Sequence, residues 1–252
     1  MSMNTTTRRP VYAALLLVAA LSAGCATGPN ANPKDPLEPM NRSISTFNDT
    51  LDDNVLKPVA TGYRDFTPQL LQTGISNFFR NLSDVLSTVN NGLQLKGHDT
   101  AESFMRVTVN TVFGIYGIFD VATEIGLQRH PEDFGQTLGY WGVPNGPYLV
   151  LPLLGPSTVR DSSVLPLDFS LDPVSNHGVS SERTAATVVR LVDRRATLLR
   201  TSNLLSGAAI DKYSFTRDGY LQFRRNQVYD GNPPDEAQLE DPSAAPVAPS
   251  AK

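Results

Sequence analysis

The 252-residue sequence contains a single cysteine, Cys25, together with only three histidines and one tryptophan. One cysteine excludes an internal disulfide, so the fold cannot depend on such a crosslink. The formal net charge is −4 at pH 7. This acidic excess argues against a nucleic-acid partner, which would require a basic surface. It argues equally against docking on anionic lipid headgroups by charge alone.

The motifs of common hydrolases and nucleotide-dependent enzymes are also missing. The sequence has no Gly-x-Ser-x-Gly, no phosphate-binding glycine-rich loop and no His-Glu-x-x-His. The histidines, His98, His130 and His177, lie far apart in the sequence. His130 lies near Glu132 and Asp133 and could hold a metal ion, but a solvated turn is the preferred interpretation. We therefore predict a protein that is not an enzyme and that binds neither a metal nor a cofactor.

Residues 1–24 have the layout of an export signal. Two arginines precede an apolar run at residues 11–21, and small residues precede Cys25. The run is well below the roughly 20 residues that a membrane-spanning helix needs. This pattern is typical of a bacterial lipoprotein signal, in which the cysteine becomes the lipid-bearing first residue. Ala26 in place of an aspartate favours sorting to the outer membrane. The alternatives are an ordinary secretory signal or a short membrane anchor.

An acyl and diacylglycerol anchor on Cys25 would hold the mature chain at a membrane, because each buried methylene contributes about 0.8 kcal/mol and two or three chains bind durably. Residues 25–34 are rich in Pro, Asn and Gly, and we expect a lipidated flexible linker there. One folded domain is predicted at residues 35–230. The tail at 231–252 consists of Pro, Ala and acidic residues and has too few apolar groups to fold.

Apolar residues recur at intervals of three and four through most of residues 35–230, whereas a period of two is rare, so we predict an all-α fold. The first helix starts at the capping sequence Asp35-Pro36-Leu37-Glu38 and is expected to end near Pro58. A second capping sequence is expected at residues 99–102. Further helices are predicted at 59–66, from 68 toward 79, at 82–93, at about 180–200 and at about 211–228.

Two apolar stretches stand out. Residues 104–122 are apolar on nearly all sides but contain Gly114 and Gly117, so this helix is either central to a core or exposed to lipid. Residues 148–154 are as apolar as a buried strand and lie in a Gly- and Pro-rich region at 128–161, which excludes a long helix there. An irregular apolar loop needs a partner surface.

These landmarks together resemble the MlaA (VacJ) family of outer-membrane lipoproteins, over about residues 35–225. The resemblance rests on the following matches: Asp35-Pro36-Leu37-Glu38, Asn41-Arg42, Pro58-Val59-Ala60, Tyr63-Arg64-Asp65, Asn77-Phe78, Asn81-Leu82, Arg106, Asn110-Thr111, Gly114, Asp120-Val121-Ala122, Phe134-Gly135, Thr137-Leu138-Gly139, Gly142-Val143, Gly146-Pro147-Tyr148, Leu151-Pro152, Gly155-Pro156-Ser157-Thr158, Arg160-Asp161, Arg195-Ala196, Arg217-Asp218 and Tyr220.

The resemblance implies a ring-like assembly of amphipathic helices, embedded in one membrane leaflet, with a Gly/Pro-rich apolar hairpin and a central channel. It implies a protein of the inner leaflet of a Gram-negative outer membrane, facing the periplasm. Such a protein removes mislocalised phospholipid from the outer leaflet, passes it to a soluble periplasmic carrier and associates with an outer-membrane porin trimer. The alternatives are an envelope scaffold bound to a porin without lipid transfer, and a phospholipid hydrolase.

A phospholipid needs a polar route for its headgroup, because a bare charge in hydrocarbon costs several kcal/mol. The candidate channel-lining residues are Arg64, Arg106, Asn110 and Arg160. The alternative is that the pairs Arg64-Asp65, Arg160-Asp161 and Arg217-Asp218 simply form local salt bridges or helix caps. The candidate gating hairpin comprises Gly146, Pro147, Tyr148, Leu151, Pro152 and Gly155, with a static apolar plug as the alternative.

Overall fold

Helices make up nearly all of the regular structure in the computed structural model, which describes residues 32–176, 178–208 and 210–234. Cys25, the signal at 1–24 and most of the predicted linker and tail lie outside the described residues. The elements are α2 (Glu38–Leu51), the π-helical turn η2 (Asp52–Leu56), α3 (Lys57–Phe66), α4 (Gln69–Leu93), α5 (Gly97–Val112), α6 (Val121–Glu124), α7 (Phe134–Tyr140), β1 (Tyr148–Leu151), β2 (Gly155–Thr158), α8 (Val159–Leu171), α9 (Pro173–Asn176), α10 (Ser180–Ala208) and α11 (Lys212–Val228). The prediction of a mainly helical fold is confirmed.

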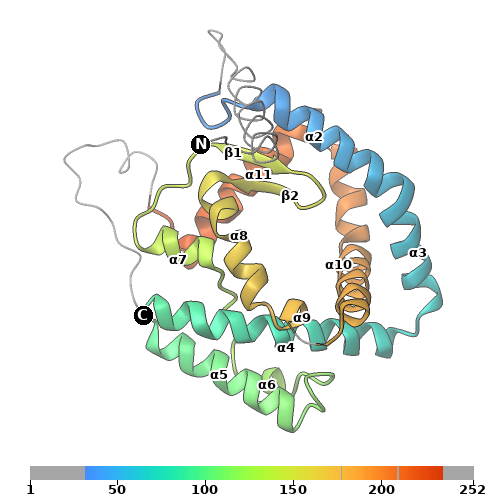
Figure 1. Cartoon of the computed structure of the whole chain (residues 1–252), viewed down its shortest axis with the longest axis vertical. Helices are drawn as coiled ribbons and strands as arrows, with labels where there is room; N and C mark the ends of the chain where they lie inside the picture. Colours follow the sequence, from blue (N-terminus) through green and yellow to red (C-terminus); the bar gives the residue numbers. More distant parts are fainter. Residues whose placement is uncertain (1–31, 177, 209, 235–252) are drawn as a thin grey trace, which may run out of the picture.

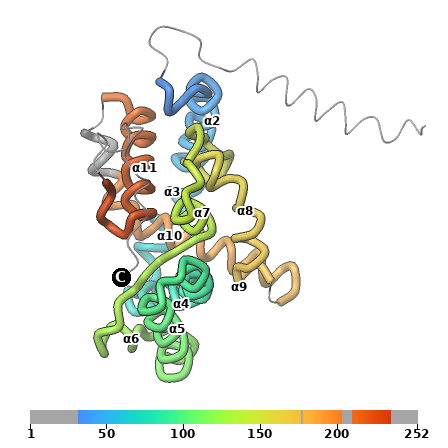
Figure 2. Tube along the Cα trace, turned by 90° about the vertical axis from the view of Figure 1, so that its left-hand side faces the viewer, coloured from blue at the N-terminus to red at the C-terminus, as the bar shows by residue number. Residues whose placement is uncertain are grey.

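The elements are arranged as a ring (Figure 1). The hairpin and α11 lie opposite α4, α5 and α6, and the two sides are connected by α3 with α10 and by α7 with α8. Helix α10 packs against α3 and α4, while α11 packs against α7 and β2. Figure 2 shows α11 on one side of the ring and α8 with α9 on the other.

The first helix does not end at Pro58 as the sequence suggested. The chain passes from α2 through η2 directly into α3, and Pro58 occupies the first turn of α3. The Lys57 amide donates to the Asp52 carbonyl across the wider π-turn. A proline in a first helical turn sacrifices no intrahelical bond, and the π-turn absorbs the extra residue, so the helical path continues.

The two helices expected on either side of residues 80–81 are one helix, α4. Asn81, between the two apolar runs, faces the protein instead of ending the helix. Asn81 is buried, and its Nδ2 donates to Thr111 Oγ1 on α5 at 3.1 Å. A polar side chain in mid-helix is therefore no end signal when a neighbouring helix supplies its partner.

Three further features differ from the expectation. The Asp35 side chain does not cap the first helix: α2 begins at Glu38 with no side-chain cap, and Asp35 accepts instead from Asn41 Nδ2 at 2.8 Å. Helix α5 begins at Gly97, ahead of the predicted cap at residues 99–102, and its first turn has no side-chain cap. Helix α8 was not predicted and contains Pro166. It begins where Thr158 accepts a hydrogen bond from the Asp161 amide, and it packs against α7 and β2. These tertiary contacts outweigh the cost of the internal proline.

The apolar segment predicted as strand-like forms an antiparallel hairpin. Tyr148 pairs with Thr158 at its base and Leu151 with Gly155 at its tip. The turn places Leu153 and Gly155 at φ of 67° and 84°. Positive φ is the conformation that glycine adopts at no steric cost, which explains Gly155 at this position.

Polarity is inverted compared with an ordinary water-soluble protein. In the described part of the chain, buried polar and charged side chains outnumber buried apolar ones, and many large apolar side chains are exposed. Helix α4 illustrates this arrangement, since Asp84 and Asn91 are buried while Val85 and Val89 are exposed. No helix among the described residues has both the length and the apolar character needed to cross a membrane.

Candidate functional site

An apolar groove of about 560 Å³ lies between the first half of α4, the turn after α5 and the start of α10. Its lining includes Leu70, Leu71, Phe78, Phe79, Ile118 and Val189. The turn reaches the groove because α5 stops at Val112 and residues 115–117 all adopt positive φ. The predicted apolar helix at 104–122 is therefore interrupted, and its second half becomes one wall of the groove.

A second hollow of about 400 Å³ continues along the same two helices. Four arginines line it, Arg80, Arg129, Arg190 and Arg194, and we call it the arginine pocket. Phe79 lies in the lining of both hollows, so the groove and the pocket adjoin. Together they form what we call the α4–α10 trough, apolar at one end and basic at the other.

Two of the four guanidinium groups are already neutralised by carboxylates. Arg129 Nε lies 2.6 Å from Asp84 Oδ1, and Arg190 Nη1 lies 2.8 Å from Asp172 Oδ2. The other two side chains, Arg80 and Arg194, make no hydrogen bond or ion pair with the part of the chain that the structure describes. The pocket therefore has an excess of positive charge.

The carboxylate that lines the pocket, Asp193, reduces this excess but does not cancel it, because two unpaired arginines face one carboxylate. Asp193 is buried, and its two oxygens accept hydrogen bonds from Tyr63 Oη at 3.0 Å and from Ser76 Oγ at 2.7 Å. The guanidinium fork matches the oxygens of a phosphate, so two unpaired arginines can hold a phosphate oxyanion. Next to an apolar groove, this arrangement can bind an amphiphile with an anionic headgroup.

Arg106 occupies the centre of a buried network between α4, α5 and α6. Its Nη2 lies 3.0 Å from Asp120 Oδ1, its Nη1 donates to the Leu127 carbonyl at 2.6 Å, and its Nε lies 3.6 Å from Asp84 Oδ2. Only 4% of the Arg106 side chain is exposed. The structure thus shows Arg106 engaged with protein groups, and its role in lining a channel stays a prediction.

Asn110 holds the same network from one turn further along α5. Its Nδ2 donates to Asp120 Oδ1 at 3.0 Å, and its Oδ1 accepts the Ala122 amide at 2.8 Å, which fixes the start of α6. Burial would raise the pKa of Asp120, but hydrogen bonds from Thr123 and Asn110 outweigh it and hold the pKa below its usual value. At Asp84, burial prevails over its two arginine partners and raises the pKa.

The remaining candidate arginines lie in different surroundings. Arg64 is exposed on α3 and forms a local pair with Asp65 at 2.9 Å. Arg160 is buried at the start of α8, where its Nε donates to Asp161 Oδ1 at 3.0 Å. The other Asp161 oxygen accepts from Arg224 Nε at 2.8 Å. Arg106 and Asn110 therefore share one network through Asp120, whereas Arg64 and Arg160 lie elsewhere and form the local pairs of the alternative interpretation.

The ends of the candidate hairpin are fixed by the backbone. Gly146 has a φ of 66° ahead of β1, and the Pro147 carbonyl accepts the Val159 amide at 3.1 Å. Pro152 lies in the turn, between Leu151 and Gly155. The base of the hairpin is thereby joined to the start of α8.

Two asparagines on α2 hold the outer edge of β1. Asn41 donates to the Tyr148 carbonyl at 3.0 Å and accepts the Val150 amide at 2.9 Å. About two turns further along the same face of α2, Asn48 donates to the Leu151 carbonyl at 2.9 Å. These amides replace a neighbouring strand at an edge that would otherwise be unpaired. Such attachment favours a static hairpin over a gate.

Sequence reasoning missed the α4–α10 trough. Arg190 and Arg194 are four residues apart and so share a face of α10, which was a detectable signal. Nothing in the sequence indicated that Arg80 on α4 would face them. Also missed was a buried cluster in which Lys96 Nζ lies 3.0 Å from Glu132 Oε1 and 2.6 Å from Asp230 Oδ1.

Comparison with known proteins places this arrangement in a family. The family model described as MlaA lipoprotein matches residues 33–227. The chain belongs to the MlaA family. This confirms the resemblance drawn from the sequence.

The match to relatives in the MlaA family extends over most of the length of each relative. The Escherichia coli protein named intermembrane phospholipid transport system lipoprotein MlaA is 36% identical over 83% of this chain and 85% of its own. A Haemophilus influenzae protein of the same name is 31% identical over 88% of this chain and 92% of its own. A solved structure from work on the structural basis for maintenance of bacterial outer membrane lipid asymmetry has a TM-score of 0.68 and 35% identity. It covers 77% of this chain and 98% of the solved one.

Proposed function

We propose that this protein removes mislocalised phospholipid from the outer membrane and passes it to a soluble periplasmic carrier, and that the α4–α10 trough holds the lipid during transfer. The observation that carries the proposal is the contact between the apolar groove and the arginine pocket at Phe79. The names of the MlaA relatives, which describe intermembrane phospholipid transport, support the same function.

The inverted polarity supports a membrane location. Phe104, Val112, Phe113 and Tyr116 are each more than half exposed on α5 and the turn that follows it. In water this surface would be costly, whereas in the hydrocarbon of one leaflet, about 15 Å deep, it is stabilised. With an acyl anchor on Cys25, such a ring would lie in the inner leaflet of the outer membrane and face the periplasm. A central channel through the ring is part of this proposal.

The trough provides what lipid transfer requires energetically. Ten acyl methylenes moved from lipid into water cost about 8 kcal/mol, at ~0.8 kcal/mol each. An apolar groove removes much of this cost. The phosphate loses hydration at the same time, and a hydrogen bond to a charged group returns about 1.5–3 kcal/mol. Arg80 and Arg194 are available for this role because no carboxylate in the described chain engages them.

The partners follow from this function: phospholipid, an outer-membrane porin trimer that places the ring in the membrane, and a soluble carrier. The hairpin from Gly146 to Gly155 would act as a fixed wall of the passage, since α2 holds its edge through Asn41 and Asn48. Arg106, Asn110 and Arg160 would shape the passage mainly by holding its helices in place, whereas the exposed Arg64 pairs with Asp65 on its own helix.

The decisive experiment measures transfer of labelled phospholipid from proteoliposomes containing the full-length protein to a periplasmic carrier. The double variant Arg80→Glu/Arg194→Glu is expected to reduce transfer and co-purified phospholipid by about tenfold or more, because two charge-assisted contacts become repulsive. The control is Arg200→Glu, which makes one such replacement on an exposed face of α10 outside both linings, and each single variant, Arg80→Glu or Arg194→Glu, is compared with it at equal charge.

The outcomes separate the proposals. Transfer by the native protein that the double variant leaves unchanged would refute the trough as the lipid site. Absence of transfer by the native protein would refute the function and favour a porin-bound scaffold. Release of lysolipid or free fatty acid from the labelled phospholipid would identify a hydrolase instead.

A further inference from the structure

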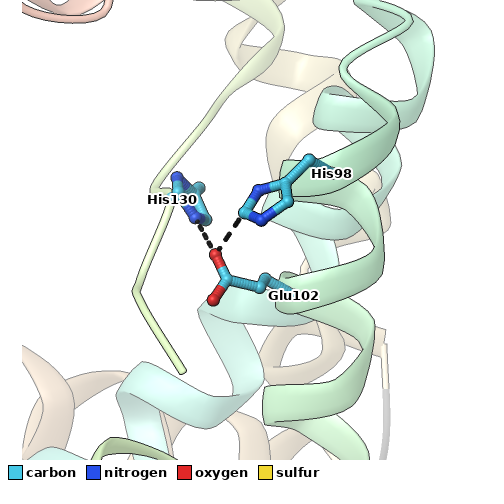
Figure 3. Close-up of side chains that lie close together, drawn as sticks. All are labelled: His98, Glu102 and His130. Atoms are coloured by element: carbon cyan, nitrogen blue, oxygen red, sulfur yellow. Dashed lines mark hydrogen bonds and ion pairs between the residues drawn. The ribbon is translucent and has the colours of Figure 1, made fainter. Parts of the chain in front are cut away.

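Two imidazoles and a carboxylate meet beside the first turns of α5 (Figure 3). His130 Nε2 lies 2.7 Å from Glu102 Oε2, and His98 Nδ1 lies 3.7 Å from the same oxygen. The three ligand atoms are all within 4.8 Å of one another. The carboxylate that His130 contacts is thus Glu102, and not Glu132 or Asp133, which follow it in the sequence.

We propose that His98, Glu102 and His130 form a binding site for a divalent transition-metal ion, with zinc as the best match. Two imidazole nitrogens and one carboxylate oxygen form a donor set that suits zinc. A tetrahedral zinc site with bonds of about 2.0–2.1 Å places its ligand atoms about 3.3 Å apart. The two distances to Glu102 fall on either side of this value and the third is at most 4.8 Å, so side-chain movements can bring the three ligand atoms to it.

The backbone that carries the three ligands is fixed. His98 and Glu102 are four residues apart on α5 and therefore share a face of the helix. The His130 carbonyl accepts from Asn91 Nδ2 at 3.1 Å, and Glu102 Oε1 accepts the Gln128 amide at 3.1 Å. The connector between α6 and α7 is thereby held against α4 and α5 before any metal binds, which lowers the ordering cost of binding.

Charge and access also fit a divalent cation. A second carboxylate, Asp99 Oδ1, lies 3.2 Å from Nδ1 of His98 and 3.7 Å from Nδ1 of His130. With both rings neutral, as metal binding requires, the four side chains carry two negative charges. His98 is 71% exposed, which gives an ion a path from solvent and leaves room for a water ligand. A bound ion would join the connector to α5 and stabilise this corner of the ring.

The test uses the untagged full-length protein in detergent, freed of metal with a chelator and titrated with zinc or cobalt. We expect one equivalent to bind, a visible cobalt absorption band typical of tetrahedral coordination, and a higher thermal unfolding midpoint with zinc. His98→Ala and Glu102→Gln should each weaken zinc binding by more than about tenfold and abolish the band. His177→Ala, which removes the third histidine, is the matched control and should bind as the native protein does.

Zinc binding by His98→Ala and Glu102→Gln with native affinity would overturn the proposal, as would equal loss in His177→Ala. Folding of each variant is checked by far-ultraviolet circular dichroism. Because the His98 side chain is exposed, His98→Ala is the variant expected to disturb the fold least. A protein that takes up no zinc or cobalt at all would also overturn it.

Discussion

Replacement of Arg106 by methionine tests the buried network that connects α4, α5 and α6. Methionine keeps the apolar stem but removes the guanidinium that contacts Asp84, Asp120 and the Leu127 carbonyl. Asp84 is 3% exposed and Asp120 28% exposed, so neither carboxylate regains full hydration. Breaking a buried ion pair on one side costs about 3–5 kcal/mol. Because Asp84 keeps Arg129 as a partner, we expect Arg106→Met to lower the free energy of unfolding by the lower end of that range.

The measurement is urea unfolding in detergent, followed by the fluorescence of the single tryptophan, Trp141. Its Nε1 donates to the Leu93 carbonyl, so it reports on the end of α4. The matched control is Arg64→Met, because the Arg64–Asp65 pair is about half exposed on both sides and contributes about 0–1 kcal/mol. If both variants lost equally little stability, the carboxylates would not depend on Arg106, and the network would not organise this corner of the ring.

Three further variants test other parts of the fold. Gly117→Ala should lower the free energy of unfolding by about 2–4 kcal/mol, because φ is +89° and a Cβ would lie 2.6 Å from the Asn81 Cβ. The control Gly62→Ala in α3 places its Cβ in open space and should raise the free energy of unfolding by about 0.5–1 kcal/mol. Equal effects of the two variants in urea unfolding would contradict this. Asn41→Ala should cost about 2–3 kcal/mol and speed amide exchange at Val150, while unchanged exchange would disprove the edge contact. Burial raises the pKa of Asp168 to about 6, so its contribution to stability is present below about pH 4 and is lost as the pH rises through 6. Asp168→Asn should therefore raise the free energy of unfolding by about 1 kcal/mol at pH 7.5, after allowance for solvent screening, and change it little at pH 4. A difference between the two proteins that does not depend on pH would refute this.

The sequence anticipated much of the helical framework. Helix α11 is capped by Asp211, whose side chain accepts the Tyr213 amide, and an aspartate cap of this kind is a local signal. The strand at Tyr148–Leu151 was also recognisable, because an apolar run between glycines and prolines has few other solutions. Failures occurred where a distant partner decided the outcome. Asn81 continues α4 because Thr111 accepts its hydrogen bond, and Pro58 is tolerated because η2 precedes it.

The sequence by itself determined the helical class, the family and the apolar segments, because periodicity, capping and motif order are properties of neighbouring residues. Only the tertiary structure decided which polar groups share a site. Arg80 on α4 and Arg194 on α10 line one pocket, and His98 and His130 lie beside one carboxylate, although each pair is separated by many residues. Charge and metal coordination depend on distances of a few ångströms in space, and those distances are set by the packing of helices around the ring.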